Sequence, residues 1–255
     1  MKKSLAGKTA LVTGGSRGLG QAIAEKLAAE GALVAVNYAE NHAAADAAVA
    51  RILAAGGDAF AVQAKLGGEA EALRLAEAID REFTARMGSA GLDILVNNIG
   101  GGDYAAMLDV TEEFYDQVMA NNLRGAFFLT KALHGRINDM GRVINLSSVG
   151  ARLSDPGIVV YTMAKSALDA FTRVMAAELG PRGITVNAVA PGFTAGETND
   201  YIVADPVAAK SVTDVTALRR FGQPAEIADI VYALASPLGR WVTAQCIEAS
   251  GGFKL

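Results

Sequence analysis

The stretch KTALVTGGSRGLG, residues 8–20, decides how the fold of this chain is interpreted. Residues 8–12 form a short, mostly apolar run that predicts a buried parallel strand. Residues 13–20 are glycine-rich and lead into a helical pattern at 21–30. Glycines let a backbone approach an anion, and a helix N-terminus supplies N–H donors. The stretch therefore favours a nucleotide site, although its spacing is not G-x-G-x-x-G and a tight strand-to-helix turn also requires glycine.

The rest of the chain repeats this alternation of apolar strand and helix. Strands are predicted at 33–38, 59–66, 92–98, 141–147, 184–190 and 242–248, and helices at 41–55, 69–86, 111–119, 122–133, 158–179 and 224–235. The pattern predicts an α/β fold, a Rossmann-type doubly wound parallel sheet of about seven strands with helices on both faces. We expect one domain over 1–255, with the polar, irregular segment 193–220 and its single helical stretch as a candidate substrate lid.

Composition excludes several classes of protein. Hydrophobic residues make up 51% of the 255 and charged residues 20%, which argues against disorder. The net charge of −4 argues against a nucleic-acid surface. No apolar stretch reaches the roughly 18 residues of a membrane span and no signal-type run precedes the first strand, so we expect a cytoplasmic protein. His42 and His134 lie far apart in sequence, which makes a metal site improbable, and the single cysteine, Cys246, is expected to be a buried, inert thiol.

Tyr161 and Lys165 stand four residues apart at the start of a predicted helix, so their side chains share one face. A free tyrosine titrates near ~10, and a neighbouring ammonium favours the phenolate and lowers that pKa. Such a pair can give a proton to an alkoxide or take one from an alcohol. An ordinary helix with a solvated lysine shows the same spacing, so the pair alone does not indicate catalysis. The other motifs of the chain decide between the two interpretations.

Those motifs resemble the short-chain dehydrogenase/reductase family, in its compact single-domain form, along essentially the whole chain. They follow the family's order: Thr13-Gly14-x-x-x-Gly18-x-Gly20, Asn97-Asn98-Ile99-Gly100, Asn122-Leu123, Ser148, Tyr161-x-x-x-Lys165 and Pro191-Gly192. Ser148 precedes Tyr161 by 13 residues, as the family's active site requires. The segments ITVNAVAPGF and EASGG resemble the 3-oxoacyl-carrier-protein-reductase-like members in particular.

The resemblance implies a catalytic role for four residues. Tyr161 would be the general acid, and Ser148 would polarise the substrate carbonyl. Lys165 would lower the pKa of Tyr161 and bind the nicotinamide ribose. Asn122 would hold a water that links Lys165 to solvent. The neighbouring Ser147 and Asn121 are the alternatives. Ser147 is expected to point to the other face of its strand, and the Leu-x-Gly that follows favours Asn122.

The resemblance also implies an NADP(H) or NAD(H) cofactor. Its candidate ligands are Gly14, Ser16, Arg17, Gly18, Leu19, Gly20, Tyr38, Asn98, Gly100, Tyr161, Lys165, Pro191, Gly192 and Thr194. NAD is usually held by an acidic residue at the end of the second strand, where this chain has Tyr38. Arg17 in the glycine loop suits a 2′-phosphate, so NADP(H) is preferred, although Glu40 is nearby.

Several positions depart from the family pattern. Ile99 replaces the usual alanine beside the cofactor, where it either narrows the pocket or is a neutral packing change. Lys65 replaces an aspartate at the end of the third strand, which weakens an adenine contact but suits a 2′-phosphate. Gly196 stands where the family often has threonine, with Thr194 and Thr198 on either side. Arg182 matches a basic residue used for docking carrier protein, but Asp139 occupies the second such place, which favours a free ketone.

The sequence thus predicts an NADP(H)-dependent enzyme that reduces a small-molecule ketone or oxidises the alcohol. The alternatives are a 3-oxoacyl-[acyl-carrier-protein] reductase, an NAD-dependent alcohol dehydrogenase, and a nucleotide-binding scaffold or regulator without catalysis. Family members pair long helices between subunits, which implies a homodimer or homotetramer. The stripe of Leu168, Phe171, Val174 and Met175 suits such an interface or packing on the sheet. Tyr104, Tyr201, Phe193 and Leu153 are candidates to line an apolar substrate pocket.

Overall fold

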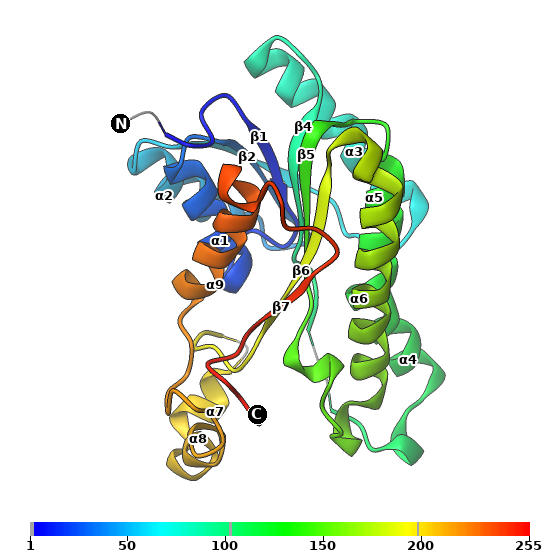
Figure 1. The fold of residues 1–255 in the computed structure, drawn as a ribbon, viewed down its shortest axis with the longest axis vertical. Helices are drawn as coiled ribbons and strands as arrows, with labels where there is room; N and C mark the ends of the chain where they lie inside the picture. The colour runs from blue at the N-terminus through cyan, green and yellow to red at the C-terminus, as the bar shows by residue number, and fades with distance from the viewer. Residues whose placement is uncertain (1–2, 102–103, 198) are drawn as a thin grey trace.

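The computed structural model describes residues 3–101, 104–197 and 199–255. Within them, seven parallel strands form one sheet in the order β3-β2-β1-β4-β5-β6-β7 (Figure 1). The strands are β1 (Thr9–Val12), β2 (Leu33–Tyr38), β3 (Asp58–Gln63), β4 (Leu92–Asn97), β5 (Ile137–Leu146), β6 (Thr185–Pro191) and β7 (Cys246–Ala249). The order reverses between β1 and β4, which confirms the doubly wound Rossmann-type fold. In such sheets ligands bind at that reversal, beyond the carboxyl ends of the strands.

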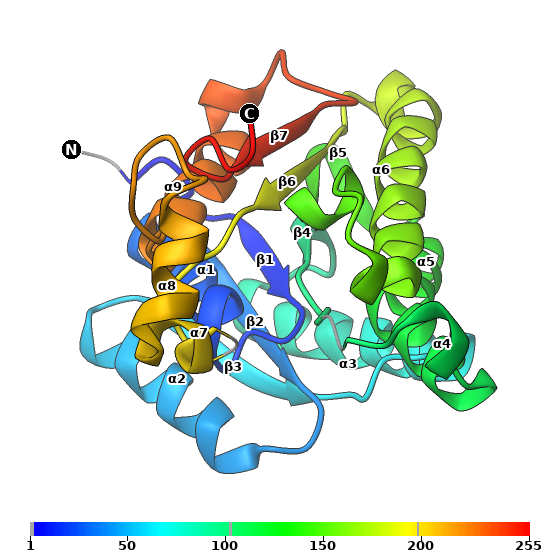
Figure 2. The ribbon, with the colours of Figure 1, turned by 90° about the horizontal axis from the view of Figure 1, so that it is seen from below.

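Helices cover both faces of the sheet (Figures 1 and 2). The longer ones are α1 (Gly18–Ala29), α2 (His42–Ala54), α3 (Glu69–Met87), α4 (Glu112–Met119), α5 (Gly125–Leu133), α6 (Val159–Leu179) and α9 (Pro224–Ala235). Alternate strand residues point to opposite faces, as a pleated sheet requires. Val12, Val36 and Val96 pack with α1, α2 and α9, whereas Leu11 and Leu95 pack with α3, α5 and α6. Two apolar cores therefore hold the strand ends in fixed register.

The structure corrects three expectations about secondary structure. Strand β5 begins at Ile137, not at 141, because Ile137 already pairs with Leu92 of β4, and the register shifts before Arg142 pairs with Ile94. The segment 193–220 contains two short helices, α7 (Asp200–Ala204) and α8 (Pro206–Thr213), rather than one. A π-helical turn, Ala120–Arg124, joins α4 to α5 where a continued or new α-helix was expected.

One expectation about burial is also corrected. Cys246 is exposed on the edge strand β7, although partial burial of its thiol and the nearby Asp169 carboxylate raise its pKa to about 12. The proposed stripe on α6 is divided. Leu168 and Met175 are buried, whereas the side chain of Val174 is 63% exposed. No helix that the structure describes is both long and apolar enough to cross a membrane.

Candidate active site

The glycine loop after β1 is shaped by two different requirements for glycine. Gly14 and Gly18 have φ of 60° and 56°, a region that side-chain-bearing residues rarely adopt. At Gly20 a Cβ atom would lie 2.2 Å from the carbonyl oxygen of Gly14, so only glycine allows α1 to start this close to the loop. Asn98 Nδ2 donates to the Thr13 carbonyl oxygen at 2.8 Å, and its backbone N–H donates to Thr13 Oγ1 at 2.9 Å. The loop is therefore fixed against the end of β4, with the start of α1 facing the cleft.

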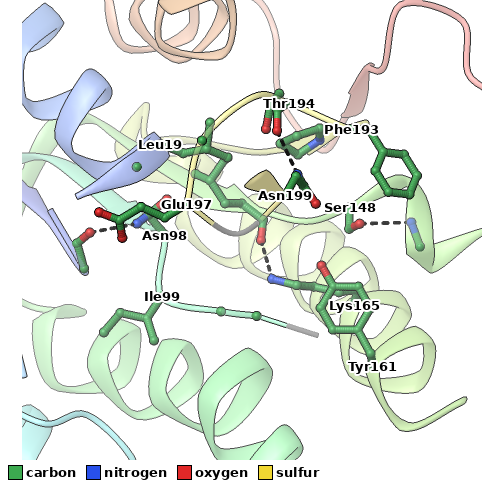
Figure 3. A pocket seen from close by; sticks show the side chains of 18 of the residues that line it. Leu19, Asn98, Ile99, Ser148, Tyr161, Lys165, Phe193, Thr194, Glu197 and Asn199 are labelled. Carbon is green, nitrogen blue, oxygen red and sulfur yellow. Dashed lines mark hydrogen bonds between the residues drawn. The ribbon is translucent and has the colours of Figure 1, made fainter. Parts of the chain in front are cut away.

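The serine, the tyrosine and the lysine meet beside this loop, at the end of β5 and the start of α6 (Figure 3). Ser148 caps a short 3₁₀ turn, and its Oγ accepts from the Gly150 N–H at 3.0 Å. Lys165 lies one helical turn after Tyr161 and is 2% exposed. Its Nζ donates to the Leu146 carbonyl oxygen at 2.8 Å. The i, i+4 spacing thus places both side chains on the face of α6 that lines the cleft.

Asn122 lies behind these residues, in the π-helical turn, and is 1% exposed. Its Nδ2 donates to the carbonyl oxygens of Gly101 and Val118 at 2.8 and 2.9 Å, and its Oδ1 accepts from the Gly101 N–H at 3.1 Å. A Cβ atom on Gly100 would lie 2.8 Å from both Asn122 Oδ1 and Lys165 Nζ. Gly100 therefore brings these two polar groups close to one another, and π-helical turns are frequent at functional sites.

The two alternative residues lie differently. Ser147 is 5% exposed, and its hydroxyl has no hydrogen-bond partner among the residues that the structure describes. Asn121 is exposed, in contrast to the buried Asn122. Ser147 and Asn121 both line the cleft, as Ser148 does, whereas Asn122 does not. Ser148 and Asn122 differ from them in that their side chains bond to the loops around the site.

Electrostatics at the site differ from the expectation that Lys165 lowers the pKa of Tyr161. Burial raises the pKa of the Tyr161 phenol, an effect that the Ser148 hydroxyl opposes. Burial also lowers the pKa of the Lys165 ammonium to about 8, and the Asp169 carboxylate opposes that change. The ammonium lies 5.7 Å from the centroid of the Tyr161 ring and bonds to a backbone carbonyl. Desolvation is therefore the largest influence on the pKa of Tyr161, and the phenol is protonated at neutral pH.

A single cleft of about 1720 Å³ joins the glycine loop, this cluster and residues of the candidate lid segment. Every predicted cofactor ligand lines it: Gly14, Ser16, Arg17, Gly18, Leu19, Gly20, Tyr38, Asn98, Gly100, Tyr161, Lys165, Pro191, Gly192 and Thr194. Ser148 and all four candidate pocket residues, Tyr104, Leu153, Phe193 and Tyr201, line it as well. Phe253 and Glu197 also line it, and sequence reasoning missed both, because neither belongs to a motif.

A group of charged and polar side chains lines the cleft near the end of β2. Arg17 pairs with Glu197 of the lid at 3.5 Å, and Lys65 pairs with Glu40 at 2.8 Å. The Tyr38 hydroxyl is hydrogen-bonded to His42 Nδ1 at 2.5 Å. The positively charged side chains of Arg17 and Lys65 thus lie where a 2′-phosphate is expected, and each is paired with a carboxylate.

The remaining departures from the family pattern have local explanations. Ile99 packs between Gly14 and the core formed by α3, α5 and α6. Gly196 has φ of 131°, which a threonine would rarely adopt. Thr194 is buried, and its carbonyl accepts from Asn199 Nδ2 at 2.8 Å. Thr198 lies outside the described residues.

Comparison with known proteins identifies the family. The family model described as Enoyl-(Acyl carrier protein) reductase matches residues 14–254. An uncharacterised oxidoreductase of Methylorubrum extorquens is 43% identical, with 98% of this chain and 99% of the relative covered. A 3-oxoacyl-[acyl-carrier-protein] reductase of Synechocystis is 39% identical, with 98% of each covered. The crystal structure of the angucycline C-6 ketoreductase LanV with bound NADP superposes with a TM-score of 0.94 at 42% identity, covering 98% of this chain and 97% of LanV.

The chain belongs to the short-chain dehydrogenase/reductase family. It is an NAD(P)-dependent oxidoreductase that acts on a carbonyl or alcohol group.

Proposed function

We propose that this protein is an NADP(H)-dependent reductase of a small-molecule ketone. The observation that carries the proposal is the meeting of Ser148, Tyr161 and Lys165 in one cleft with the glycine loop. A serine that caps a turn, a protonated phenol and a buried ammonium are the groups needed to bind, polarise and protonate a carbonyl oxygen. NADP-bound LanV, at 42% identity, supports the same cofactor here.

The roles of the residues follow from their surroundings. NADPH supplies the hydride when it is bound, so the chain must orient the ketone and deliver a proton. Ser148 donates a hydrogen bond to the carbonyl oxygen, and Tyr161 gives that oxygen its proton. Tyr161 carries its proton at neutral pH, because the pKa of a phenol is ordinarily about 10 and burial raises it further. Lys165 holds its ammonium beside Tyr161, and Asn122 fixes the loop at Gly101 and, through a water, returns protons from solvent.

Cofactor preference is proposed to rest on Arg17. Its guanidinium is exposed at the mouth of the cleft and can form two hydrogen bonds with a 2′-phosphate. Lys65 adds a second positive charge from the end of β3. Tyr38 occupies the place of the carboxylate that usually selects NAD.

Fluorescence titration with NADPH and NADH, followed by a screen of ketones, tests the proposal. We expect tighter binding of NADPH, a loss of that preference in Arg17→Ala, and turnover of ketones with NADPH. Lys131→Ala removes an exposed ammonium far from the glycine loop and serves as the control. Preferred binding of NADH would favour an NAD-dependent alcohol dehydrogenase. Cofactor binding without turnover on any carbonyl would indicate a nucleotide-binding scaffold or regulator.

A 3-oxoacyl-[acyl-carrier-protein] reductase is the second candidate, because a relative of that name aligns along the full chain. A carrier protein is acidic and needs basic residues near the entrance. The guanidinium of Arg182 already has partners within this chain. Its Nε pairs with Asp139 Oδ1 at 2.8 Å, and its other nitrogens donate to the carbonyl oxygens of His134 and Ile137. Asp139 lies within β5, not before it. Saturating activity on the carrier-linked substrate, with none on free ketones, would select this candidate.

We further propose a homodimer or homotetramer in the cytoplasm. Phe127 of α5 and Val174 of α6 are 45% and 63% exposed, so both helices present apolar side chains to solvent. Light scattering coupled to size exclusion should give a mass of two or four chains. A single-chain mass would refute the proposal.

A further inference from the structure

The C-terminal segment, residues 250–255, forms part of the cleft wall. Three backbone hydrogen bonds of 2.8 to 3.0 Å tie it to residues 215–218, which follow α8 in the lid. Phe253 lines the cleft and is only 4% exposed. Its ring centroid lies 5.1 Å from that of Phe193, the first residue of the lid segment. The segment is thus packed between the sheet and the lid, as Figure 1 shows for the end of the chain beside α7 and α8.

One arginine holds this segment in place. Arg152 follows the turn capped by Ser148, and its guanidinium pairs with both oxygens of Glu248 at 2.6 and 2.7 Å. The same guanidinium donates to the carbonyl oxygens of Phe253 and Lys254 at 2.6 and 3.2 Å. A planar donor group with four such contacts fixes orientation as well as distance. Arg152 therefore links the loop of the reactive serine to the end of the chain.

Phe253 contacts both the loop after Ser148 and the helices of the lid. It belongs to a small apolar cluster with Val149, beside the serine, and with Ile202 and Val212 from the two lid helices. Phe193 packs against the same cluster. A displacement of Phe253 would change the position of the lid helices relative to the catalytic serine.

The Arg152–Glu248 ion pair is partly exposed, which limits its contribution to the stability of the fold. The side chains of Arg152 and Glu248 are 41% and 30% exposed, and pairs at the surface contribute little to global stability. The carbonyl contacts, by contrast, act on the backbone of the residue that lines the cleft. Arg152 should therefore affect the position of Phe253 more than it affects the global stability of the fold.

We propose that the C-terminal segment is a wall of the ketone-binding part of the cleft and that Arg152 and Glu248 are the positioning residues that hold Phe253 there. Phe253 is then a specificity-determining residue for ketones that carry a bulky, uncharged group. Phe193 packs beside Phe253, and Tyr104 and Tyr201 line the same cleft, so the group beside the carbonyl meets aromatic surfaces. This inference rests on the proposed ketone reduction.

The test compares acetophenone with the larger acetylnaphthalene as substrates, with NADPH, in Arg152→Ala, Phe253→Ala and the exchanged pair Arg152→Glu/Glu248→Arg. Loss of positioning should raise KM for the larger ketone roughly tenfold in both alanine variants, with kcat and NADPH affinity within about twofold. The exchanged pair restores the ion pair but leaves no donor at position 152 for the carbonyl oxygens of Phe253 and Lys254, so it should recover little of the loss. Arg51→Ala breaks a surface arginine–glutamate pair between α2 and α1 and should change nothing.

Hydrogen exchange supplies a readout that needs no turnover. Amides of 215–218 and 250–255 should exchange faster in Arg152→Ala than in wild type, and at the wild-type rate in Arg51→Ala. Unchanged KM values and unchanged exchange would overturn the inference. If wild type reduces no ketone, the proposed function fails and the specificity role fails with it, while exchange still decides whether Arg152 holds the segment.

Discussion

Replacement of Lys165 by methionine should abolish turnover and also change how stability depends on pH. Burial lowers the pKa of this ammonium to about 8 from an ordinary 10.5, so the folded state disfavours the charged form. Below about pH 8 the buried charge destabilises the fold by about 3 kcal/mol relative to its neutral form. As the pH rises from about 8 to 10.5 the folded lysine loses its proton before the unfolded one does, and that cost disappears.

The magnitude follows from these two pKa values. Between about pH 7 and pH 9.5 the free energy of unfolding of wild type should rise by about 2 kcal/mol relative to Lys165→Met, because the variant has no amine to titrate. The loss of the hydrogen bond to the Leu146 carbonyl affects the variant at every pH and cancels in this difference. Urea unfolding of the cofactor-free protein at several pH values measures it.

Lys131→Met is the matched control, because it removes an exposed ammonium from the same class of residue. Its unfolding free energy should run parallel to that of wild type over the whole pH range. If the difference between wild type and Lys165→Met does not change with pH, the lysine is not desolvated as the structure implies, and the electrostatic account of the site is refuted.

Substitutions at three further positions test other parts of the site. Glu197→Ala removes the carboxylate beside Arg17 and should tighten NADPH binding severalfold while NADH binding stays unchanged, as read by fluorescence titration; equal effects on both cofactors would contradict it. Gly100→Ala places a methyl group 2.8 Å from both Lys165 Nζ and Asn122 Oδ1, so it should displace these groups and lower kcat at least ~tenfold; unchanged kcat would contradict it. Thr13→Val leaves two backbone N–H groups without their acceptor and should cost about 2–4 kcal/mol of unfolding free energy, whereas Thr13→Ser should cost little; equal losses in the two variants would refute the hydrogen-bond explanation.

The motifs predicted from sequence lie together because each stands at the carboxyl end of a strand or the start of the next helix. Gly14 follows β1, Asn98 follows β4, Ser148 follows β5 and Gly192 follows β6, and parallel strands bring these ends to one edge. Once the alternation of strands and helices is recognised in the sequence, the strand order therefore predicts where the site lies.

The parts that sequence could not predict depend on contacts between distant segments. Nothing near Phe253 or Arg152 in the chain indicates that they meet, since their contacts span about a hundred residues. The pKa of Tyr161 was expected to fall because spacing reports the neighbouring charge but not the burial of both groups. Cys246 lies in an apolar stretch, but its strand is at the edge of the sheet, which hydrophobicity alone does not reveal.

The most direct test of the central claim is NADPH-dependent reduction of a ketone panel by Tyr161→Phe. Phenylalanine keeps the ring and its packing but cannot donate the proton, so kcat should fall by roughly 10²-fold or more while NADPH binding is retained. Turnover close to that of wild type across the panel would contradict the assignment of Tyr161 as the general acid, and with it the proposed reduction chemistry.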